Sequence, residues 1–241
     1  MTAVLGFLRA KRSELDTWLT EKGVAHTFSL PVYQLHRHTL PLVERYAASP
    51  CLDAGSGRSP WKPLLAARGV EVTSLDVEDR AGEVDLIADL QDMPAVADAS
   101  AMTVLCTQVL EHLPRPWDAM AEIHRVLVPG GHLILSVPHL SVIHEAPHDY
   151  YRYTRYGLRA LAERSGLEVV RIVESGGLFS FLSHAVSMVL FCTLAAVPGL
   201  RWITWKSNLV LIHGLGLVDR LFGMARIYPC NHVLLARKPP A

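Results

Sequence analysis

The sequence lacks an excess of either charge, clustered cysteines and a signal peptide. Lysine plus arginine and aspartate plus glutamate number 23 each, so nothing indicates the basic surface that nucleic-acid-binding domains carry. The four cysteines lie far apart without a C-x-x-C pair, so neither a disulfide framework nor a zinc site is indicated. Residues 1–18 reach Arg9, Lys11 and Arg12 after a short apolar run. Because that run is too short for the core of a signal peptide, we expect a cytoplasmic protein.

Apolar material, in contrast, is abundant. Half of the 241 residues are hydrophobic and 19% are charged, which is enough for a large core and argues against disorder. The length fits one large domain or two small ones. We expect one domain over residues 1–241, with N-terminal helices in 1–48, a core in 49–174, an insertion in 175–231 and a last strand in 232–237.

Short β-branched runs alternate with helical stretches between residues 40 and 174, a pattern typical of βαβ units and a largely parallel sheet. A helix is expected over residues 116–127, and Pro129-Gly130-Gly131 is expected to turn the chain into the next strand. Thr154 is expected to cap a further helix that ends near Gly166. The predicted strands are residues 50–53, 70–76, 85–88, 102–107, 132–138, 167–174 and 232–237.

The first predicted strand ends in a glycine-rich turn, Asp53-Ala54-Gly55-Ser56-Gly57. Two glycines one residue apart let the backbone turn sharply and approach a ligand closely. A dinucleotide-binding fingerprint needs a third glycine where this chain has Pro60, so that fingerprint is broken. An acid two residues before the first glycine suits a ligand that is cationic or donates hydrogen bonds. A turn with no ligand is the alternative.

Two further acids stand at the ends of the next predicted strands. Asp76 comes about 20 residues after the glycines, where nucleotide-binding sheets place an acid against ribose hydroxyls. Asp89 follows the third strand. Each acid alone is equally compatible with a solvated loop, but three acids at the carboxyl ends of consecutive strands indicate one ligand site.

Two motifs downstream complete a pattern that resembles a known family. Residues 109–113 are V-L-E-H-L and residues 127–131 are L-V-P-G-G. Together with the turn at 53–57, they resemble class I S-adenosylmethionine-dependent methyltransferases of the type 11 small-molecule group. The resemblance covers residues 35–174 and the last strand. It implies an enzyme, S-adenosyl-L-methionine as its cofactor, and a Rossmann-like, doubly wound α/β sheet of seven strands with an antiparallel last strand.

The resemblance also implies roles for individual residues. The turn Asp53-Ala54-Gly55-Ser56-Gly57 would line the methionine part of the cofactor. Asp76 would accept hydrogen bonds from the ribose hydroxyls, and Asp89 from the adenine amino group. The other implied contacts are Val77 beside the adenine, Leu90 beside Asp89, Thr107 and Gln108 beneath the cofactor, and His112 near its methionine end, where His112 can equally serve only to support the loop.

The segment that follows the fifth predicted strand, residues 138–154, is rich in histidine. In the family this loop reaches over the methyl group, so His148, His139 and Asp149 are the predicted catalytic residues, with a histidine as the general base for a hydroxyl acceptor. His144 is a weaker candidate. The alternative is that the loop serves only to fix the next helix. The 12 histidines show no recognisable set of metal ligands, so no metal site is predicted.

Charge is absent from residues 175–200, which lie in an insertion of about 57 residues before the last strand. We expect a helix over 178–197 with a narrow polar stripe, a belt of aromatic and basic residues at 201–206, and a second helix from about residue 208. Three interpretations compete. The insertion is a hairpin that spans a bilayer, a hairpin that lies in the membrane interface, or a helical lid or homodimer face formed by residues 178–226.

These observations predict methyl transfer from S-adenosyl-L-methionine to a small acceptor, with a hydroxyl of a hydrophobic or lipid-linked molecule favoured. The sulfonium is already an activated leaving group, so the pattern specifies the donor and says little of the acceptor. The alternatives are N- or C-methylation of a soluble metabolite and a non-catalytic cofactor-binding subunit that associates with a membrane. Asp53 and Pro60 disfavour a nicotinamide oxidoreductase.

Overall fold

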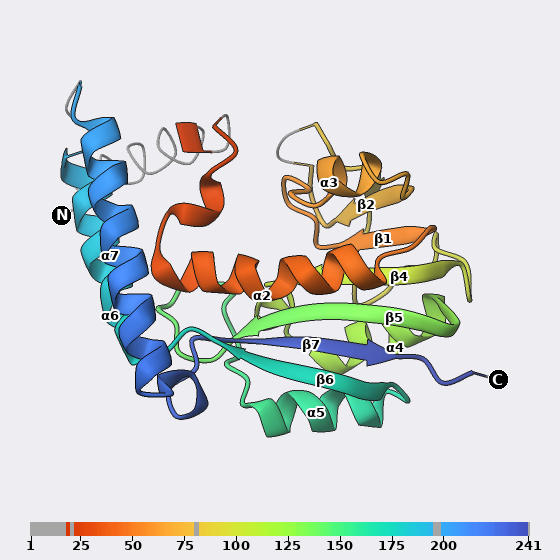
Figure 1. Cartoon of the computed structure of the whole chain (residues 1–241). Coiled ribbons are helices and arrows are strands. Elements are labelled where there is room, and N and C mark those ends of the chain that lie inside the picture. The colour runs from red at the N-terminus through yellow and green to blue at the C-terminus, as the bar shows by residue number, and fades with distance from the viewer. Residues whose placement is uncertain (1–17, 20–21, 80–81, 195–198, 241) are drawn as a thin grey trace. The chain divides into compact units, whose positions relative to one another are not determined.

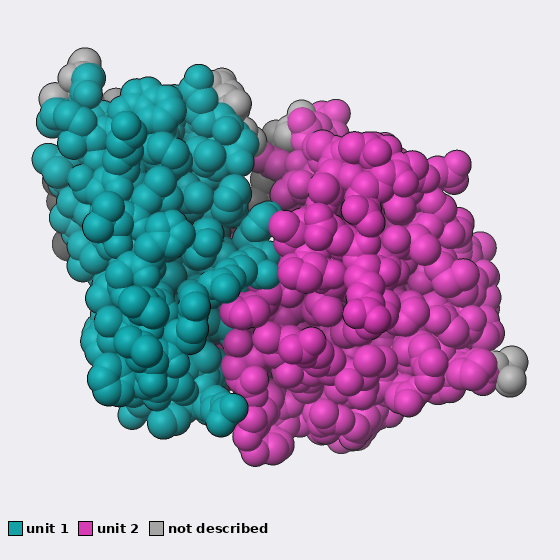
Figure 2. Space-filling view, viewed as in Figure 1, with its two compact units in different colours: residues 1–37, 175–230 teal, residues 38–174, 231–241 magenta. Residues whose placement is uncertain are grey.

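The computed structural model describes residues 18–19, 22–79, 82–194 and 199–240. The chain forms two compact units, shown in different colours in Figure 2. Residues 38–174 and 231–241 form one, which we call the sheet unit, and residues 1–37 and 175–230 form the other, the helical unit. The predicted insertion at 175–231 therefore groups with the N-terminal segment, of which residues 1–17 lie outside the described residues.

Seven strands form one sheet in the order β3-β2-β1-β4-β5-β7-β6 (Figure 1). The neighbours from β3 to β5 pair in parallel, and β7 is antiparallel to β5. This confirms the predicted Rossmann-like α/β fold. The strand order reverses between β1 and β4, which is where doubly wound sheets bind ligands. The strands are β1 (Cys51–Ala54), β2 (Val72–Asp76), β3 (Leu86–Ile87), β4 (Ala101–Thr107), β5 (Leu127–Pro138), β6 (Glu168–Ser175) and β7 (Asn231–Arg237).

Helices α4 (Pro116–Val126) and α5 (Arg155–Arg164) bury their apolar faces in the main core of the sheet unit. Met120 and Ile123 from α4 and Leu158 from α5 are fully buried there with residues of β4 and β5. As predicted, Thr154 caps α5: its Oγ1 accepts a hydrogen bond from the Gly157 amide at 3.1 Å. The sheet unit also contains α3 (Lys62–Ala66) and the short 3-10 helix η2 (Leu110–His112).

The turn predicted at residues 129–131 is instead the irregular first part of β5. Helix α4 ends at Val126 and the strand begins at the next residue. Gly130 takes a positive φ of 83°, and its amide donates to the Lys238 carbonyl at 2.9 Å. The pairing of β5 with β4 shifts register between Ala101 and Thr103. The Pro-Gly-Gly segment therefore bends a strand rather than preceding one.

The helical unit contains the 3-10 helix η1 (Ala25–Thr27), the start of α2 (Leu30–Tyr46), α6 (Leu178–Thr193), α7 (Arg201–Leu221) and η4 (Met224–Arg226). Both hairpin helices were predicted, but α7 begins at Arg201 rather than near residue 208. The aromatic and basic residues expected to separate the helices lie instead on the first turns of α7, because no breaker follows Gly199. Among the described residues, no helix combines the length and the hydropathy needed to cross a bilayer.

Candidate functional site

A pocket of about 740 Å³ opens at the carboxyl ends of the sheet-unit strands. Its lining comes from the segments that follow β1, β2, β3, β4 and β5, and its volume is typical of sites for cofactors and small molecules. Eight of the 12 predicted cofactor residues line it: Gly55, Gly57, Asp76, Val77, Asp89, Leu90, Gln108 and His112. Asp53, Ala54, Ser56 and Thr107 are not among its lining residues.

The glycine turn leaves no room for side chains at its first glycine. Gly55 has a φ of +72°, and a Cβ there would collide with the side chain of Val109. Gly57 also has a positive φ, 55°, but a Cβ at this position would meet nothing. The Gly57 amide donates to Asp76 Oδ2 at 2.8 Å, so the acid that ends β2 also holds the turn that follows β1. The backbone can therefore approach a ligand closely at this corner of the pocket.

Asp53 lies behind the turn as a buried, incompletely paired acid. Asp53 is only 1% exposed, and its Oδ2 has no hydrogen-bond partner. Burial, assisted by the nearby charge of Asp76, raises the pKa of Asp53 to about 7. A cation bound next to it would stabilise the ionised carboxylate. This fits the ammonium group of the implied cofactor.

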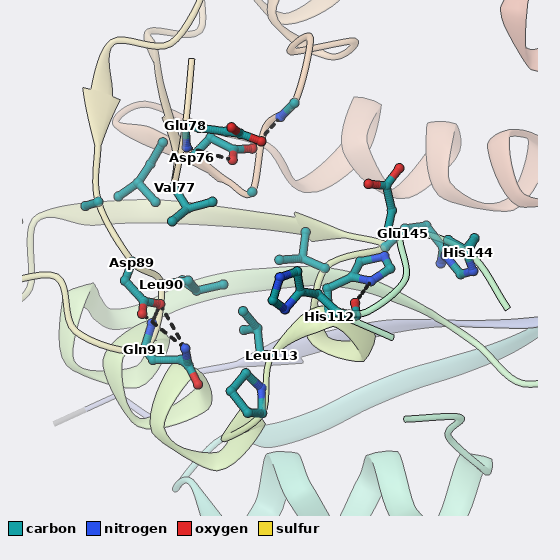
Figure 3. Close-up of a pocket in the computed structure, with 18 residues that line it drawn as sticks. Asp76, Val77, Glu78, Asp89, Leu90, Gln91, His112, Leu113, His144 and Glu145 are labelled. Atoms are coloured by element: carbon teal, nitrogen blue, oxygen red, sulfur yellow. Dashed lines mark hydrogen bonds between the residues drawn. The ribbon is translucent and has the colours of Figure 1, made fainter. Parts of the chain in front are cut away.

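The acids that end β2 and β3 lie together on one side of the pocket (Figure 3). Asp89 accepts hydrogen bonds from the amide and side chain of Gln91, at 2.8 and 3.1 Å. Leu90 is buried beside it, whereas Val77 is 67% exposed. Carboxylates with apolar neighbours on a pocket wall suit a flat ring that carries hydrogen-bond donors.

His112 and His144 line the opposite side of the pocket (Figure 3). They form a cluster with Glu111, which is not among the lining residues. Nε2 of His112 is 3.8 Å, and Nε2 of His144 is 4.0 Å, from Glu111 Oε1. The Glu111 side chain is fully buried and neither of its oxygens has a hydrogen-bond partner. Burial raises the pKa of Glu111 to about 8. The ligating atoms of the three residues lie within 4.8 Å of one another, although no metal site was predicted.

The rings of His112 and His144 are held through Nδ1, the nitrogen that does not face Glu111. His112 Nδ1 lies 2.6 Å from the carbonyl oxygen of His148, and His144 Nδ1 lies 3.1 Å from that of Val142. Because a carbonyl oxygen only accepts, we assign the ring proton to Nδ1 in both residues. Each Nε2 then presents a lone pair toward Glu111 and can take up a proton.

The three predicted catalytic residues occupy different environments. His148 lines the pocket, and its Nδ1 is 3.1 Å from the hydroxyl of Tyr150. His139 and Asp149 are not among the lining residues. His139 Nδ1 contacts the carbonyl of Tyr153 at 3.0 Å. Asp149 pairs with Arg152 through both oxygens, which holds the pKa of its carboxyl far below the usual range, and accepts from the His144 amide at 2.9 Å.

Sequence reasoning missed the position of Glu111 beside two histidines. The residue stands inside the V-L-E-H-L motif, next to a histidine that was assigned to the cofactor. A buried acid beside a histidine was the available signal. The convergence of His144 on it, from a loop more than 30 residues away, could not be derived from spacing.

Comparisons with known proteins identify a methyltransferase domain in part of this chain. A family model for a methyltransferase domain matches residues 52–135. A ubiquinone biosynthesis O-methyltransferase from Pseudomonas aeruginosa is 26% identical over an alignment of 157 positions that covers 53% of this chain and 68% of that protein. The segment that the family model matches includes the glycine turn and the V-L-E-H-L motif.

Solved structures show the same fold at low sequence identity. A Burkholderia thailandensis 1,6-didemethyltoxoflavin-N1-methyltransferase, solved with S-adenosylhomocysteine, has a TM-score of 0.53 and 20% identity, covering 99% of this chain and 88% of its own. The [4+2]-cyclase SpnF has a TM-score of 0.60 and 18% identity, covering 85% and 81%. Because a cyclase shares the fold, the fold alone does not fix the reaction.

Proposed function

Because the chain is a class I S-adenosylmethionine-dependent methyltransferase, we propose that it methylates a hydroxyl group on a small hydrophobic acceptor. The observation that carries the proposal is the buried Glu111 carboxyl facing Nε2 of both His112 and His144. An alcohol or phenol must lose its proton to become a strong nucleophile, whereas a neutral amine already has a lone pair. A base beside a carboxyl group that can stabilise its protonated form suits O-methylation.

S-adenosyl-L-methionine supplies a methyl group on a sulfonium, whose leaving group is a neutral thioether, so the chain's task is to position the reactants. Asp76 and Asp89 would accept hydrogen bonds from the hydroxyl and amino groups of the cofactor. The unpaired Oδ2 of Asp53 offers a charge for its ammonium group. Gly55 and Gly57 would keep this part of the wall open.

In the proposed mechanism His112 or His144 takes the acceptor's proton on Nε2. The ionised form of the Glu111 carboxyl, 3.8–4.0 Å from Nε2 of the two histidines, would stabilise the imidazolium that forms. The carbonyls of His148 and Val142 hold the rings in the required tautomer. Asp149 would act as a positioning residue, because it holds the His144 amide and the Arg152 side chain. His148, predicted as the base, also lines the pocket and is the alternative.

Two observations support an O-methylated, hydrophobic acceptor. The relatives named for ubiquinone biosynthesis are O-methyltransferases. The wall beside His112 is apolar, with Val109, Leu113 and Pro114 among its residues. An apolar wall favours a ring or chain over a sugar or an amino acid.

The test uses purified protein, labelled S-adenosyl-L-methionine, and the organic and aqueous fractions of a cell extract. We expect the label in a product of the organic fraction. The labelled methyl group should resist alkali, as that of a methyl ether does. Label only in aqueous N- or C-methyl products would replace the proposal with the second predicted activity. Cofactor binding without any labelled product would favour the non-catalytic subunit.

The base is tested separately with variants and a chelator. We expect His112→Ala and His144→Ala together to lower kcat at least about 100-fold, within the usual range for a general base, while His124→Ala on α4, outside the pocket, changes it little. Activity should survive EDTA. If EDTA abolishes activity and Mg²⁺ or Mn²⁺ restores it, the cluster is a metal site and the base assignment is wrong.

A further inference from the structure

The interior of the helical unit is unusually polar. Six side chains on α6 and α7 that are at most 5% exposed carry hydroxyl, amide or carboxylate groups: Ser180, Ser183, Ser187, Thr204, Asn208 and Asp219. They are bonded to one another or to nearby backbone. Ser187 Oγ donates to Asn208 Oδ1 at 2.7 Å, and Asn208 Nδ2 donates to the Thr27 carbonyl at 3.0 Å. Asp219 accepts from the Phe179 and Ser180 amides at 3.0 and 2.8 Å.

The exterior of the same helices is apolar. On α6, Leu182, Val186 and Val189 are 47–63% exposed and recur at i, i+4 and i+7. On α7, the exposed large aliphatic residues are Ile203, Val210, Leu217 and Leu221, again on one side of the helix and 50–74% exposed. Because successive helical residues are about 100° apart, these stripes lie opposite the buried polar residues. The hairpin therefore buries polar side chains and exposes apolar ones, although the helical unit also contains a small apolar cluster of Leu19, Phe28 and Phe191.

The charges of the hairpin have one sign at its surface. Residues 175–230 contain four cations, Arg201, Lys206, Arg220 and Arg226, and a single acid, Asp219. The acid is buried and bonded to the start of α6. Trp202, beside Arg201, is half exposed. Basic and aromatic residues next to an apolar stripe are the composition of helices that bind at the surface of an anionic membrane.

We infer that the helical unit binds the surface of a bilayer containing anionic lipids, with the apolar stripes of α6 and α7 in contact with the acyl chains. Helices that contact lipid associate through small and polar residues, because lipid supplies no hydrophobic force between them, and this is the interior observed here. A second copy of the chain would cover the apolar stripes but would bring the same four cations together without an exposed hairpin acid to pair them. Charge complementarity therefore favours lipid.

Length and hydropathy together fit an orientation along the surface. Helix α7 has 21 residues, which is long enough to span a bilayer, but it is not apolar enough to do so. Helix α6 has 16 residues, which at about 1.5 Å per residue is shorter than a hydrocarbon core of about 30 Å. No described helix meets the requirements of a spanning segment. The chain would thus lie at the interface rather than cross it.

The experiment is flotation of the full chain with vesicles of phosphatidylcholine alone or mixed with phosphatidylglycerol, without methyl donor or acceptor. We expect co-flotation with the anionic vesicles, and at least about tenfold weaker binding to neutral ones or at high salt. Val210→Glu combined with Leu217→Glu should reduce binding at least about tenfold. Val170→Glu, at a residue of β6 in the sheet unit that is 50% exposed like Leu217, is the matched control and should bind as wild type.

Two results would overturn the inference. One is absence of the wild-type chain from the vesicle fraction at both compositions. The other is a stable dimer, seen by light scattering, that the double variant converts to monomer without any change in vesicle binding. Binding of S-adenosyl-L-methionine by the double variant, measured calorimetrically, controls for folding. Because no catalytic step enters this experiment, its failure leaves the proposed O-methylation untouched.

Discussion

The sheet unit and the helical unit differ in where their buried polar side chains lie. In the sheet unit, Val104, Leu133 and Leu234 are fully buried, and polar groups are placed at strand ends and helix caps. In the helical unit, hydroxyl and carboxylate groups fill the middle of the hairpin while leucine and valine face outward. In the helical unit, hydropathy alone therefore does not predict which side chains are buried.

The candidate site lies in the sheet unit. Its pocket is built from residues that follow five strands, so the position of each depends on the sheet. The helical unit buries hydrogen-bonded polar side chains between α6 and α7, and none of its described residues lines this pocket. Variants that act on one unit should therefore leave the measured property of the other unchanged, and the following predictions test this separation.

The largest effect is expected from Asp219→Ala in the polar interior. Asp219 accepts from two amides and from Ser180 Oγ, which its Oδ2 approaches to 2.5 Å. Losing these charged hydrogen bonds leaves buried donors unpaired and should lower the free energy of unfolding by about 4 kcal/mol. Urea denaturation measures this, with exposed Arg220→Ala as the control, which should change it by less than about 0.5 kcal/mol. Equal effects would show that the polar interior contributes nothing.

In the sheet unit, Gly55→Ala should nearly abolish cofactor binding. The added Cβ collides with Val109 and also strains a φ of +72°. Displacing the turn should cost about 3 kcal/mol, which is about a hundredfold in Kd. Gly57→Ala has the strain without the collision and should lose only about tenfold. Calorimetric titration with S-adenosyl-L-methionine separates the two, and vesicle flotation should be unaffected in both.

Glu111→Gln tests the buried carboxyl through pH. Its pKa is raised to about 8 when folded and is about 4.3 when unfolded. Between these values the folded state holds a proton that the unfolded state has released, so stability falls as pH rises from about 4 to 8. Glutamine cannot ionise. The variant should match wild type near pH 4 and exceed it by about 2 kcal/mol at pH 8.

Glu122→Gln is the matched control for that pH series. Its hydrogen bond with Arg125 lowers the pKa of Glu122, so its contribution is present at neutral pH and is lost as pH falls. The two variants should therefore deviate from wild type in opposite directions at pH 8. Parallel denaturation curves for both would contradict the burial of an unpaired Glu111.

Much of the sheet unit could be predicted because local and global signals coincide there. The glycine turn, the acids at Asp76 and Asp89 and the cap at Thr154 are each fixed by a few neighbouring residues. The start of β5 was missed, because Pro129 and two glycines usually mark a turn and the strand tolerates them only by shifting register. The Glu111 cluster was missed because His144 reaches it through tertiary structure.

The helical unit was harder to predict for a physical reason. The stripe of Ser180, Ser183 and Ser187 could be seen in the sequence, but the usual rule places such a stripe in solvent. The structure buries it against Asn208 of α7. Whether a polar stripe is buried or exposed depends on the helix that packs against it. The periodicity of α6 alone does not show that Asn208, 21 residues beyond Ser187, will bond to this stripe.

The smallest loss of stability is expected when a polar group is removed from an exposed helix end rather than from a buried interior. Thr154→Ala removes the acceptor for the Gly157 amide and should lower the free energy of unfolding by about 1 kcal/mol, because water can replace a cap at an exposed helix start. Thr154→Ser keeps the oxygen and should recover most of the loss. Ser187→Ala, which leaves Asn208 Oδ1 buried without its donor, should cost more, about 2 kcal/mol. If Ser187→Ala costs less than Thr154→Ala in urea denaturation, the polar interior of the hairpin is hydrated and the contrast between the two units is smaller than the structure indicates.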